Sequence, residues 1–363
     1  MAKDKKVYKI AVFPGDGIGP EVVREGLKVL KEVASLEHFR TELVEYPYCT
    51  QHYLDTGELM PEPIFDELRK FDAILVGAIG DPRVEVGLVE MAIIGGLRFK
   101  LDLYVNLRPI KLYAEHLCPL KDKTCQDIDF VVVRENTEDL YAGIGGFLKK
   151  GTPDEVAIQE MIFTRKGVER VIRYAFELAR KRNKIKKLTL VDKANAVRAM
   201  DLWTRTFEEI GQEYEDIEKD HAYVDAATMW MIKNPEWFDV IVVNNMFGDI
   251  ITDLGAMLQG GMGIAASGNL HPGQVSMFEP IHGSAPKYAG KNVANPLATI
   301  DAVRMMLDFL GEGTGARRIG RRVEHLLASK RIASLSADSG LTTSEIGDMV
   351  AAGLTSPERA HQP

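Results

Sequence analysis

Short runs of β-branched residues alternate with amphipathic stretches along almost the whole chain, and this alternation limits the folds that the chain can adopt. Strands are predicted over residues 7–13, 71–79, 129–135, 186–192 and 238–245. Helices are predicted after Pro20 and over residues 246–259 and 295–311. Such a pattern indicates an α/β fold in which helices pack on an open sheet.

The middle of the chain holds most of the polar residues that follow predicted strands. Residues 129–135, 186–192 and 238–245 end in polar side chains, and ligands bind at such strand ends in open α/β sheets. Residues 101–113 alternate in the manner of an exposed edge strand. We expect two lobes, an inner domain of residues 104–257 and a discontinuous outer domain of residues 1–103 and 258–363.

Composition excludes several kinds of partner. The net charge of -8 argues against a nucleic-acid-binding protein, which needs a basic surface to meet phosphates. No apolar stretch is long enough to span a bilayer, so no membrane partner is expected. Cys49, Cys118 and Cys125 lack the spacing of metal ligands and form no disulfide framework, which favours the cytoplasm.

Asp249 and Asp253 are four residues apart, so on a helix they share one face. Two adjacent carboxylates repel each other unless a cation or a proton intervenes, and a hard divalent ion prefers their oxygens. A solvated helix face is the alternative, but apolar neighbours make it a poor fit. Asp225, an acid in an apolar helical run, is a third candidate ligand or a capping residue.

Three arginines could bind a small di- or tricarboxylate, because a guanidinium fork matches a carboxylate. Arg98 and Arg108 bracket the segment KLDLYVNL, and Arg134 ends an apolar strand. The alternative for each is a surface position, which is least plausible for Arg134.

Tyr141 and Lys193 both follow predicted strands and form a candidate acid–base pair. A lysine close to arginines and a metal ion would have a lowered pKa and could act as a base. A tyrosine could return a proton to carbon. As isolated residues, both could equally be packing or surface groups.

The segment GDGIGP (15–20) lies between a predicted strand and a helix, as a dinucleotide-binding loop does. Its pattern is G-x-G-x-G rather than G-x-G-x-x-G, and no acidic residue follows at a strand end about 20 residues on. A Rossmann nucleotide site is therefore not predicted here.

Taken together, these segments resemble the β-decarboxylating dehydrogenases, the isocitrate/isopropylmalate dehydrogenase family. The resemblance rests on GDGIGPEV, LRFKLDLYVNLRP, VVVRENTEDLYAG, VDKAN, VDAATM, NMFGDIITDLG and FEPIHGSAPKYAG, which occur in the family's order between about Lys9 and Gly311. It implies an open α/β sheet of two lobes that is distinct from the Rossmann fold. The outer domain would bind the cofactor, and the inner domain would dimerise and hold metal and substrate.

The resemblance also implies a role for each candidate residue. Tyr141 would be the general acid and Lys193 the base. The substrate would be bound by Arg98, Arg108, Arg134, Ile94 and Asn195. Mg²⁺ or Mn²⁺ would be bound by Asp225, Asp249 and Asp253. The adenosine half of the cofactor would be bound by His282, Gly283, Ser284, Ala285, Lys287, Tyr288 and Asn295. Lys193 and Asp225 would come from the neighbouring subunit of an obligate homodimer.

The family's members differ in the group on C3 of their malate substrate. Ala92 and Ile94 stand where isocitrate enzymes carry serine and asparagine, so a third carboxylate would be left unpaired. The apolar stretch favours an alkyl group, as in the 3-isopropylmalate of leucine biosynthesis. Gly95 and Ala196 lack side-chain volume found in isopropylmalate enzymes, so a roomier pocket for bulkier 3-alkylmalates is expected. The segment ENTEDLYAGIGG keeps D-malate and tartrate as alternatives.

The resemblance implies NAD or NADP as the cofactor. NAD-using relatives place an acidic residue after HGSAP, where it would bind the ribose 2′-hydroxyl and repel a 2′-phosphate. Here Lys287 and Tyr288 follow, as in NADP-dependent isocitrate dehydrogenases. This pair favours NADP, although no later tyrosine completes a phosphate site. An alternative from a different class is a non-catalytic regulatory subunit, which would have lost a metal aspartate, the tyrosine or the lysine. All of these residues are present here.

Overall fold

The computed structural model describes residues 6–355 and divides into two compact units. Unit 1 comprises Met1–Leu101, Tyr113–Cys118 and Gln259–Pro363, and unit 2 comprises Asp102–Leu112 and Pro119–Leu258. The boundaries expected from the sequence, at 103/104 and 257/258, lie within two residues of these. The short segment Tyr113–Cys118 belongs to unit 1, whereas it was expected in the inner domain. The C-terminal segment SPERAHQP (356–363), which the sequence predicts to be a frayed tail, lies outside the described residues.

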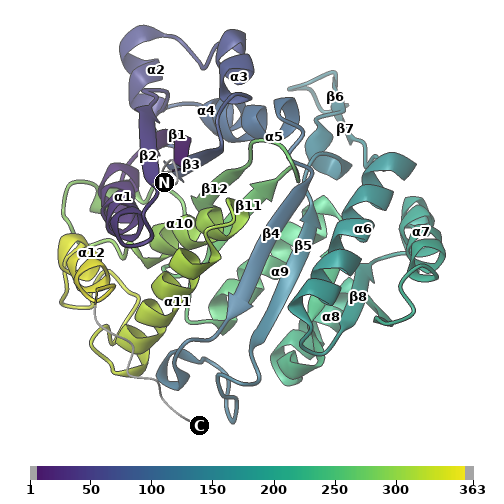
Figure 1. The fold of residues 1–363 in the computed structure, drawn as a ribbon. Coiled ribbons are helices and arrows are strands. Elements are labelled where there is room, and N and C mark those ends of the chain that lie inside the picture. The colour runs from purple at the N-terminus through teal and green to yellow at the C-terminus, as the bar shows by residue number, and fades with distance from the viewer. Residues whose placement is uncertain (1–5, 356–363) are drawn as a thin grey trace. The chain divides into compact units, whose positions relative to one another are not determined.

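Unit 1 contains a twisted sheet in the strand order β2-β1-β3-β12-β11. The strands are β1 (Val7–Gly15), β2 (Arg40–Glu45), β3 (Ala73–Ala78), β11 (Ala266–Leu270) and β12 (Met277–Pro280). All neighbouring pairs are parallel except β11 and β12, which are antiparallel. The long helices are α1 (Gly19–Leu36), α10 (Leu297–Phe309), α11 (Gly313–Ala328) and α12 (Thr343–Ala352), and α1 and α10 contact the sheet (Figure 1).

Short helices connect the strands of unit 1. They are α2 (Thr50–Thr56), α3 (Glu62–Leu68), α4 (Leu88–Glu90), the π-helix η1 (Met91–Gly95), α5 (Gly96–Lys100), η2 (Glu115–Leu117) and η6 (Pro286–Tyr288). The π-helix is notable because single π turns are rare and often occur at functional sites. It runs directly into α5, which carries Arg98.

Unit 2 contains a sheet in the strand order β4-β5-β10-β8-β9. The strands are β4 (Val105–Lys111), β5 (Asp129–Glu135), β8 (Lys187–Asp192), β9 (Glu218–Tyr223) and β10 (Val240–Val243). β4 is antiparallel to β5, and the other pairs are parallel. The helices are α6 (Arg165–Arg182), α7 (Asp201–Gly211), α8 (Val224–Lys233) and α9 (Asn245–Leu258), with the turns η3 (Asp139–Ala142), η4 (Arg198–Met200) and η5 (Pro235–Trp237).

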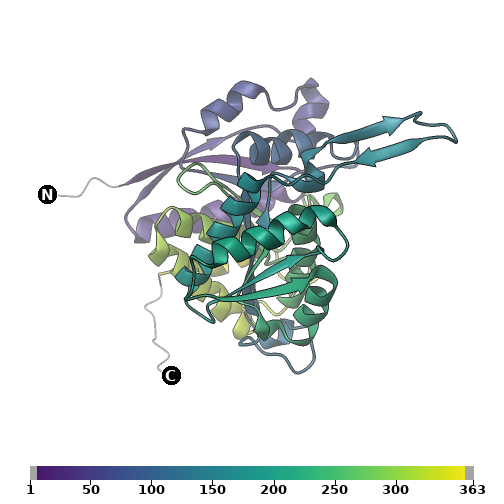
Figure 2. The ribbon, with the colours of Figure 1, turned by 90° about the vertical axis from the view of Figure 1, so that its right-hand side faces the viewer.

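A separate hairpin of β6 (Gly145–Leu148) and β7 (Val156–Gln159) extends from unit 2 (Figure 2). Its apolar side chains are solvent-exposed: Phe147 and Leu148 keep 60% and 61% of their surface. A two-stranded hairpin is only marginally stable by itself in water, so an exposed apolar one indicates a surface that something covers.

The predicted α/β class and the predicted strands and helices are confirmed, with bounds that differ by a few residues. Strand β5 is buried along its length because α6 and α9 both pack on it, α6 in front and α9 behind in Figure 1. The expected exposure of the strand near residues 101–113 is wrong. Val105 and Ile110 of β4 are buried, and Gly255 of α9 leaves room for the side chain of Ile110.

No helix among the described residues is long and apolar enough to cross a membrane.

Candidate active site

Helix α9 of unit 2 carries both of its predicted metal ligands on one face. The helix begins directly after β10, so Asp249 and Asp253 lie in its first turns, near the carboxyl ends of the parallel strands. Their side chains are 39% and 55% exposed. The spacing of four residues therefore produces the paired carboxylates that the sequence predicts.

Arg134, at the end of β5, is the most buried of the predicted site residues, with 2% of its surface exposed. Its Nε and Nη2 donate to Oδ1 of Asn245 over 2.9 and 2.7 Å, and its Nη1 contacts Oδ1 of Asp249 at 2.5 Å. A Cβ atom at position 248 would lie 2.5 Å from Cγ of Arg134, so Gly248 provides the space that this side chain fills. The fork is thus held in place by its neighbours before any ligand binds.

Arg108 approaches the same helix from β4. Its Nε donates to Oδ1 of Asn106 over 3.0 Å, and its Nη1 donates to Oγ1 of Thr252 over 2.8 Å. It also lies 3.4 Å from Asp253 and 3.7 Å from Asp249. Partial burial raises the pKa of Asp253, as does the charge of Asp249, while Arg108 opposes the shift.

Tyr141, the predicted general acid, lies in the turn η3 beside these charges. Its hydroxyl donates to Oδ2 of Asp249 over 3.1 Å, and the guanidinium of Arg134 lies 5.6 Å from the centre of its ring. Desolvation raises the pKa of the Tyr141 phenol, and the neighbouring Asp249 raises it further. The phenol therefore keeps its proton at neutral pH and has that proton to give.

The loop that carries Tyr141 is fastened by residues that the sequence analysis did not single out. Asp139 is fully buried in the left-handed region at φ 73°, and it accepts hydrogen bonds from Asn244 and from the backbone N–H of Met246. The Asn245 amide donates to the carbonyl of Glu138. Polar residues packed between the apolar strand VIVV and helix α9 were the available signal in the sequence.

Lys193 and Asp225 form a second group within unit 2. Lys193 follows β8, Asp225 lies in the first turn of α8, and Nζ of the lysine is 2.5 Å from Oδ1 of the aspartate. Among the described residues, the ammonium group therefore contacts a carboxylate rather than the expected arginines. The Asp225 side chain is 67% exposed, and its pKa is lowered by the hydrogen bond from Lys193.

The donor chemistry of α9 fits a divalent cation in part. Asp249 and Asp253 supply hard oxygen donors, and Mg²⁺ is commonly held by one or two carboxylates together with substrate and water. Within the described part of this chain, no group of three His, Cys, Asp or Glu side chains converges as a metal site. One copy of the chain thus offers two of the three predicted ligands at one place.

In unit 1, Arg98 extends from α5, and its Nη2 lies 3.0 Å from Oε1 of Glu279. Glu279 is a buried acid on β12 that also accepts a hydrogen bond from Asn269. Glu279 was not predicted from the sequence, although a glutamate inside the apolar run MFEPI is a visible anomaly. The buried Nε of Arg98 has no hydrogen-bond partner among the described residues.

The segment before Arg98 contains Gly95, one of the two positions from which a roomier pocket is expected. Ile94 is half-buried in the π-helix, and Gly95 is buried. A Cβ atom at Gly95 would lie 3.1 Å from Cε and 3.3 Å from Sδ of Met91. The volume that a larger residue would take at Gly95 is therefore partly filled by the flexible side chain of Met91. Asn195, in unit 2, is exposed in the turn after Lys193.

The predicted cofactor loop of unit 1 follows β12 and includes η6. Ala285 is in the left-handed region at φ 40°, and Nζ of Lys287 lies 4.6 Å from the centre of the Tyr288 ring. Gly283 is exposed, and a Cβ atom there would meet no atom within 4 Å.

Two buried polar atoms make this loop suitable for binding an adenosine group. Nδ2 of Asn295 and Nε2 of His282 have no hydrogen-bond partner among the described residues. Burial lowers the pKa of His282, which favours the neutral imidazole, and its Nδ1 lies 3.0 Å from the Gly283 carbonyl. If Nδ1 carries the proton, Nε2 is left as an acceptor, so the loop offers an unsatisfied donor and an unsatisfied acceptor. Adenine, which has both kinds of group, could satisfy them.

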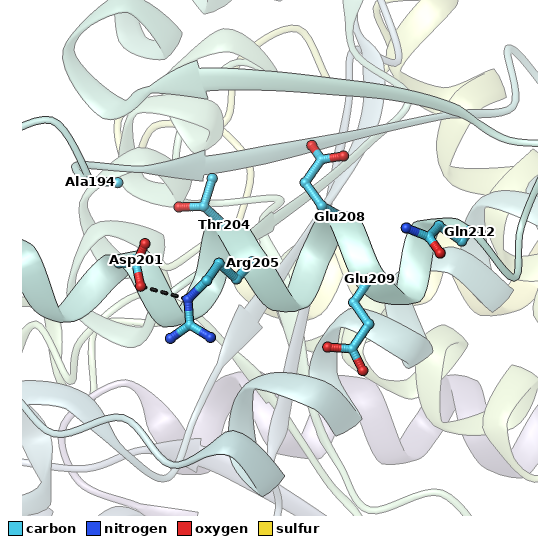
Figure 3. Close-up of a pocket in the computed structure, with 7 residues that line it drawn as sticks. All are labelled: Ala194, Asp201, Thr204, Arg205, Glu208, Glu209 and Gln212. Carbon is cyan, nitrogen blue, oxygen red and sulfur yellow. Dashed lines mark hydrogen bonds and ion pairs between the residues drawn. The ribbon is translucent and has the colours of Figure 1, made fainter.

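A surface pocket of about 450 Å³ lies along α7 of unit 2 (Figure 3). Its polar lining includes Asp201, Glu208 and Glu209, and Arg205 is paired with Asp201. None of the predicted site residues lines it; Ala194, which neighbours Lys193 and Asn195 in sequence, is its one link to them. We do not assign the chemistry to this pocket.

Comparisons with known proteins all lead to the same family. Residues 9–350 match the model of the family described as isocitrate/isopropylmalate dehydrogenase. A 3-isopropylmalate dehydrogenase from Thermobifida fusca is 49% identical over 350 residues, which cover 95% of this chain and 97% of the relative. One from Mycobacterium avium is 48% identical over 349 residues, covering 95% of this chain and 100% of the relative.

Solved structures show the same architecture. The isocitrate dehydrogenase of Methylococcus capsulatus superimposes with a TM-score of 0.86 at 37% identity, covering 96% of this chain and 99% of that one. The TT0538 protein of Thermus thermophilus superimposes with a TM-score of 0.85 at 37% identity, covering 99% of this chain and 70% of that one.

Proposed function

Because the chain belongs to the isocitrate/isopropylmalate dehydrogenase family, we propose that it oxidises and decarboxylates a 3-substituted malate, with 3-isopropylmalate as the favoured substrate. Members of the family are dehydrogenases that use a pyridine nucleotide and a divalent metal ion. The observation that carries the proposal is the cluster of Arg108, Arg134, Tyr141, Asp249 and Asp253.

Charge balance in this cluster suits a dicarboxylate substrate. The two guanidinium groups formally balance the two aspartates, so the charge of a bound divalent cation is left for the two malate carboxylates to match. Arg108 and Arg134 bind and orient those carboxylates, since a planar fork can donate two parallel hydrogen bonds. Arg98, which contacts Glu279 within unit 1, is the third arginine that we propose for substrate binding.

Proton transfer is divided between Lys193 and Tyr141. Lys193 accepts the proton of the 2-hydroxyl group as the C2 hydride leaves. Tyr141 then protonates C3 after the β-carboxylate has departed as carbon dioxide, and the raised pKa of its phenol keeps that proton available.

The nicotinamide cofactor and the divalent metal ion would contribute chemistry of their own. The nicotinamide of NAD or NADP, held through the loop of His282 to Asn295, would accept the hydride. A Mg²⁺ or Mn²⁺ ion held by Asp249 and Asp253, with Asp225, would supply Lewis acidity that stabilises negative charge on the C2 oxygen.

We propose a homodimer in which each site takes Lys193 and Asp225 from the second copy. Among the described residues, Asp225 does not converge with Asp249 and Asp253 as one metal site but pairs with Lys193, which supports this division. Exposed apolar side chains on α8 and α9, including Met229, Ile250 and Met257, provide a surface for a second copy. The exposed apolar hairpin β6–β7 provides another.

Complementation tests the shared site. Lys193→Ala and Tyr141→Phe proteins should each be nearly inactive, whereas dimers mixed from both should regain activity, because one of their two sites holds both wild-type residues. Mixed dimers without activity would place both residues in the same copy.

Lys287 and Tyr288 favour NADP, because a cation beside the adenosine site matches a 2′-phosphate.

The side chain of Met91, which lies beside Gly95, favours an alkyl group on C3 of the substrate, since a flexible thioether can adapt to chains of different length.

We place the protein in the cytoplasm, where Cys49 and Cys118 would remain as the free thiols seen here.

The first measurement is the initial rate of NAD(P)H formation with 3-isopropylmalate and Mg²⁺, with NAD and NADP in parallel. The proposal expects a metal-dependent rate that a chelator abolishes. A protein that binds cofactor but leaves 3-isopropylmalate unchanged would discard this substrate, and D-malate, tartrate, isocitrate and bulkier 3-alkylmalates would then be compared.

A further inference from the structure

The motif GDGIGPE (15–21), which does not match a Rossmann fingerprint, contacts the proposed cofactor loop directly within unit 1. Glu21 lies in the first turn of α1 and keeps only 9% of its surface exposed. Its Oε1 accepts a hydrogen bond from the backbone N–H of Gly290 over 2.5 Å, and its Oε2 accepts one from Asn292 over 2.9 Å. One side chain therefore binds both arms of a turn in the loop.

Gly17 of the same motif makes a second contact with the loop. Gly17 has a φ of +57°, and a Cβ atom there would lie 2.0 Å from the carbonyl oxygen of Ser284. That oxygen accepts a hydrogen bond from the backbone N–H of Ile18 over 2.8 Å. Ile18 and Val22 also pack against Ala294, with Ala285 and Tyr288 on the same cluster.

The loop needs such support because its backbone is in an unfavourable conformation. Ala285 and Asn292 have φ values of 40° and 55°, in the left-handed region that non-glycine residues rarely adopt. Such residues persist only when surrounding contacts hold them. Hydrogen bonds from backbone N–H groups to a charged carboxylate are among the stronger ones available.

We propose that Glu21 is a positioning residue for the nicotinamide cofactor: it fixes the loop of His282 to Asn295 in its binding conformation without touching the cofactor. The inference rests on the proposed function, because that function assigns the loop to the cofactor. The motif therefore supports a nucleotide site through a side-chain clamp rather than through a phosphate-binding glycine turn.

Glu21→Gln is the test variant. A glutamine offers one carbonyl oxygen in place of two carboxylate oxygens, so one of the two loop amides loses its partner. Glu25→Gln is the matched control, because Glu25 is also a buried acid of α1 but pairs with Lys28 and packs against Gly347 of α12. Both variants lose one buried negative charge from the same helix.

Cofactor affinity is measured without substrate, by fluorescence titration with NADH and with NADPH. Loss of a charged hydrogen bond should weaken binding by Glu21→Gln about tenfold or more, whereas Glu25→Gln should bind as the wild type does. Turnover at saturating cofactor and the KM for the malate should change little in Glu21→Gln. Hydrogen–deuterium exchange of the cofactor-free protein should be faster at Gly290 and Asn292 in that variant alone.

Gly17→Ala tests the same loop from its other contact and should also raise the dissociation constant of the cofactor. It keeps the inference testable if Glu21→Gln does not fold. Unchanged affinity in a folded Glu21→Gln protein, or equal losses in Glu21→Gln and Glu25→Gln, would overturn the positioning role. A wild-type protein that binds neither cofactor would instead overturn the assignment of the loop and the inference with it.

Discussion

The phenol of Tyr141 donates its hydrogen bond to Asp249, the same carboxylate that Arg134 contacts from the end of β5. Asp249, a proposed metal ligand, thus contacts both the proposed general acid and a guanidinium group that we propose binds the substrate. Since Asp249 raises the pKa of the phenol, the contact also keeps the acid in its protonated form.

Removing the hydroxyl should stop proton delivery to C3. For Tyr141→Phe we expect kcat to fall by about 10²–10⁴, the usual contribution of a general acid. The ring is 41% exposed, so the melting temperature should change little. Steady-state kinetics and thermal unfolding of the same preparation make the test. A folded variant with wild-type kcat would remove Tyr141 from the mechanism.

Gly248→Ala should displace Arg134, because the added Cβ atom would lie 2.5 Å from its Cγ. We expect the KM for the malate to rise about tenfold, in line with weakening one charged hydrogen bond. Gly255→Ala is a matched control on the same helix, since its Cβ atom would meet the apolar Ile110 instead. The control should lose stability, by about 1–3 kcal/mol, with KM unchanged. Equal KM values in both variants would contradict the role given to Arg134.

Gly95→Leu should narrow the substrate range. The leucine must push aside Met91, so kcat/KM should fall for malates with chains longer than isopropyl and be retained for 3-isopropylmalate. One methylene in an apolar pocket is worth about 1–3 kcal/mol, so the change in preference should reach about tenfold. Gly96→Ala serves as the control, because its Cβ atom would meet Phe65 and should lower stability alone. An unaltered chain-length preference in Gly95→Leu would place the C3 group elsewhere.

Lys287→Asp should reverse the cofactor preference. A carboxylate would repel the 2′-phosphate of NADP and could accept hydrogen bonds from the ribose of NAD, so the NADP/NAD ratio of kcat/KM should fall by about tenfold or more. Lys291→Asp makes the same charge change at an exposed position later in the loop and should leave the ratio unaltered. If the two variants behave alike, only the general charge of the loop matters.

Glu135 should make stability depend on pH. Burial raises its pKa from 4.5 to about 7, against hydrogen bonds from Thr137 and Glu138 that lower it. Between these two values the unfolded chain releases the proton that the folded chain retains, so the free energy of unfolding decreases as pH rises. The loss should total about 3 kcal/mol from pH 4.5 to pH 7 and then level off.

Urea unfolding at intervals from pH 4.5 to pH 8 measures this loss in the wild type and in Glu135→Gln. The amide cannot ionise, so the variant should lack the decrease across that interval. A decrease of the same size in both proteins would assign it to other groups.

Local patterns in the sequence were sufficient for the α/β class, for the helix that pairs Asp249 with Asp253, and for the strand that ends in Arg134. These features depend on periodicity and on residues close together in the chain, which a sequence displays directly. The spacing of four residues determined the shared helix face, whatever the rest of the fold.

Tertiary packing decided what those residues contact. No local pattern in the sequence predicts these contacts. They include the packing of α9 on β4, the space at Gly248 that Arg134 fills, the contact of Met91 with position 95, and the hydrogen bonds of Glu21 with Gly290 and Asn292. Glu279 and Asp139 were not predicted for the same reason, because the role of each depends on partners that only folding brings close to it. The sequence by itself determined which side chains stand at the strand ends. Only the tertiary structure decided their neighbours, since buried polar groups must find partners wherever the chain packs.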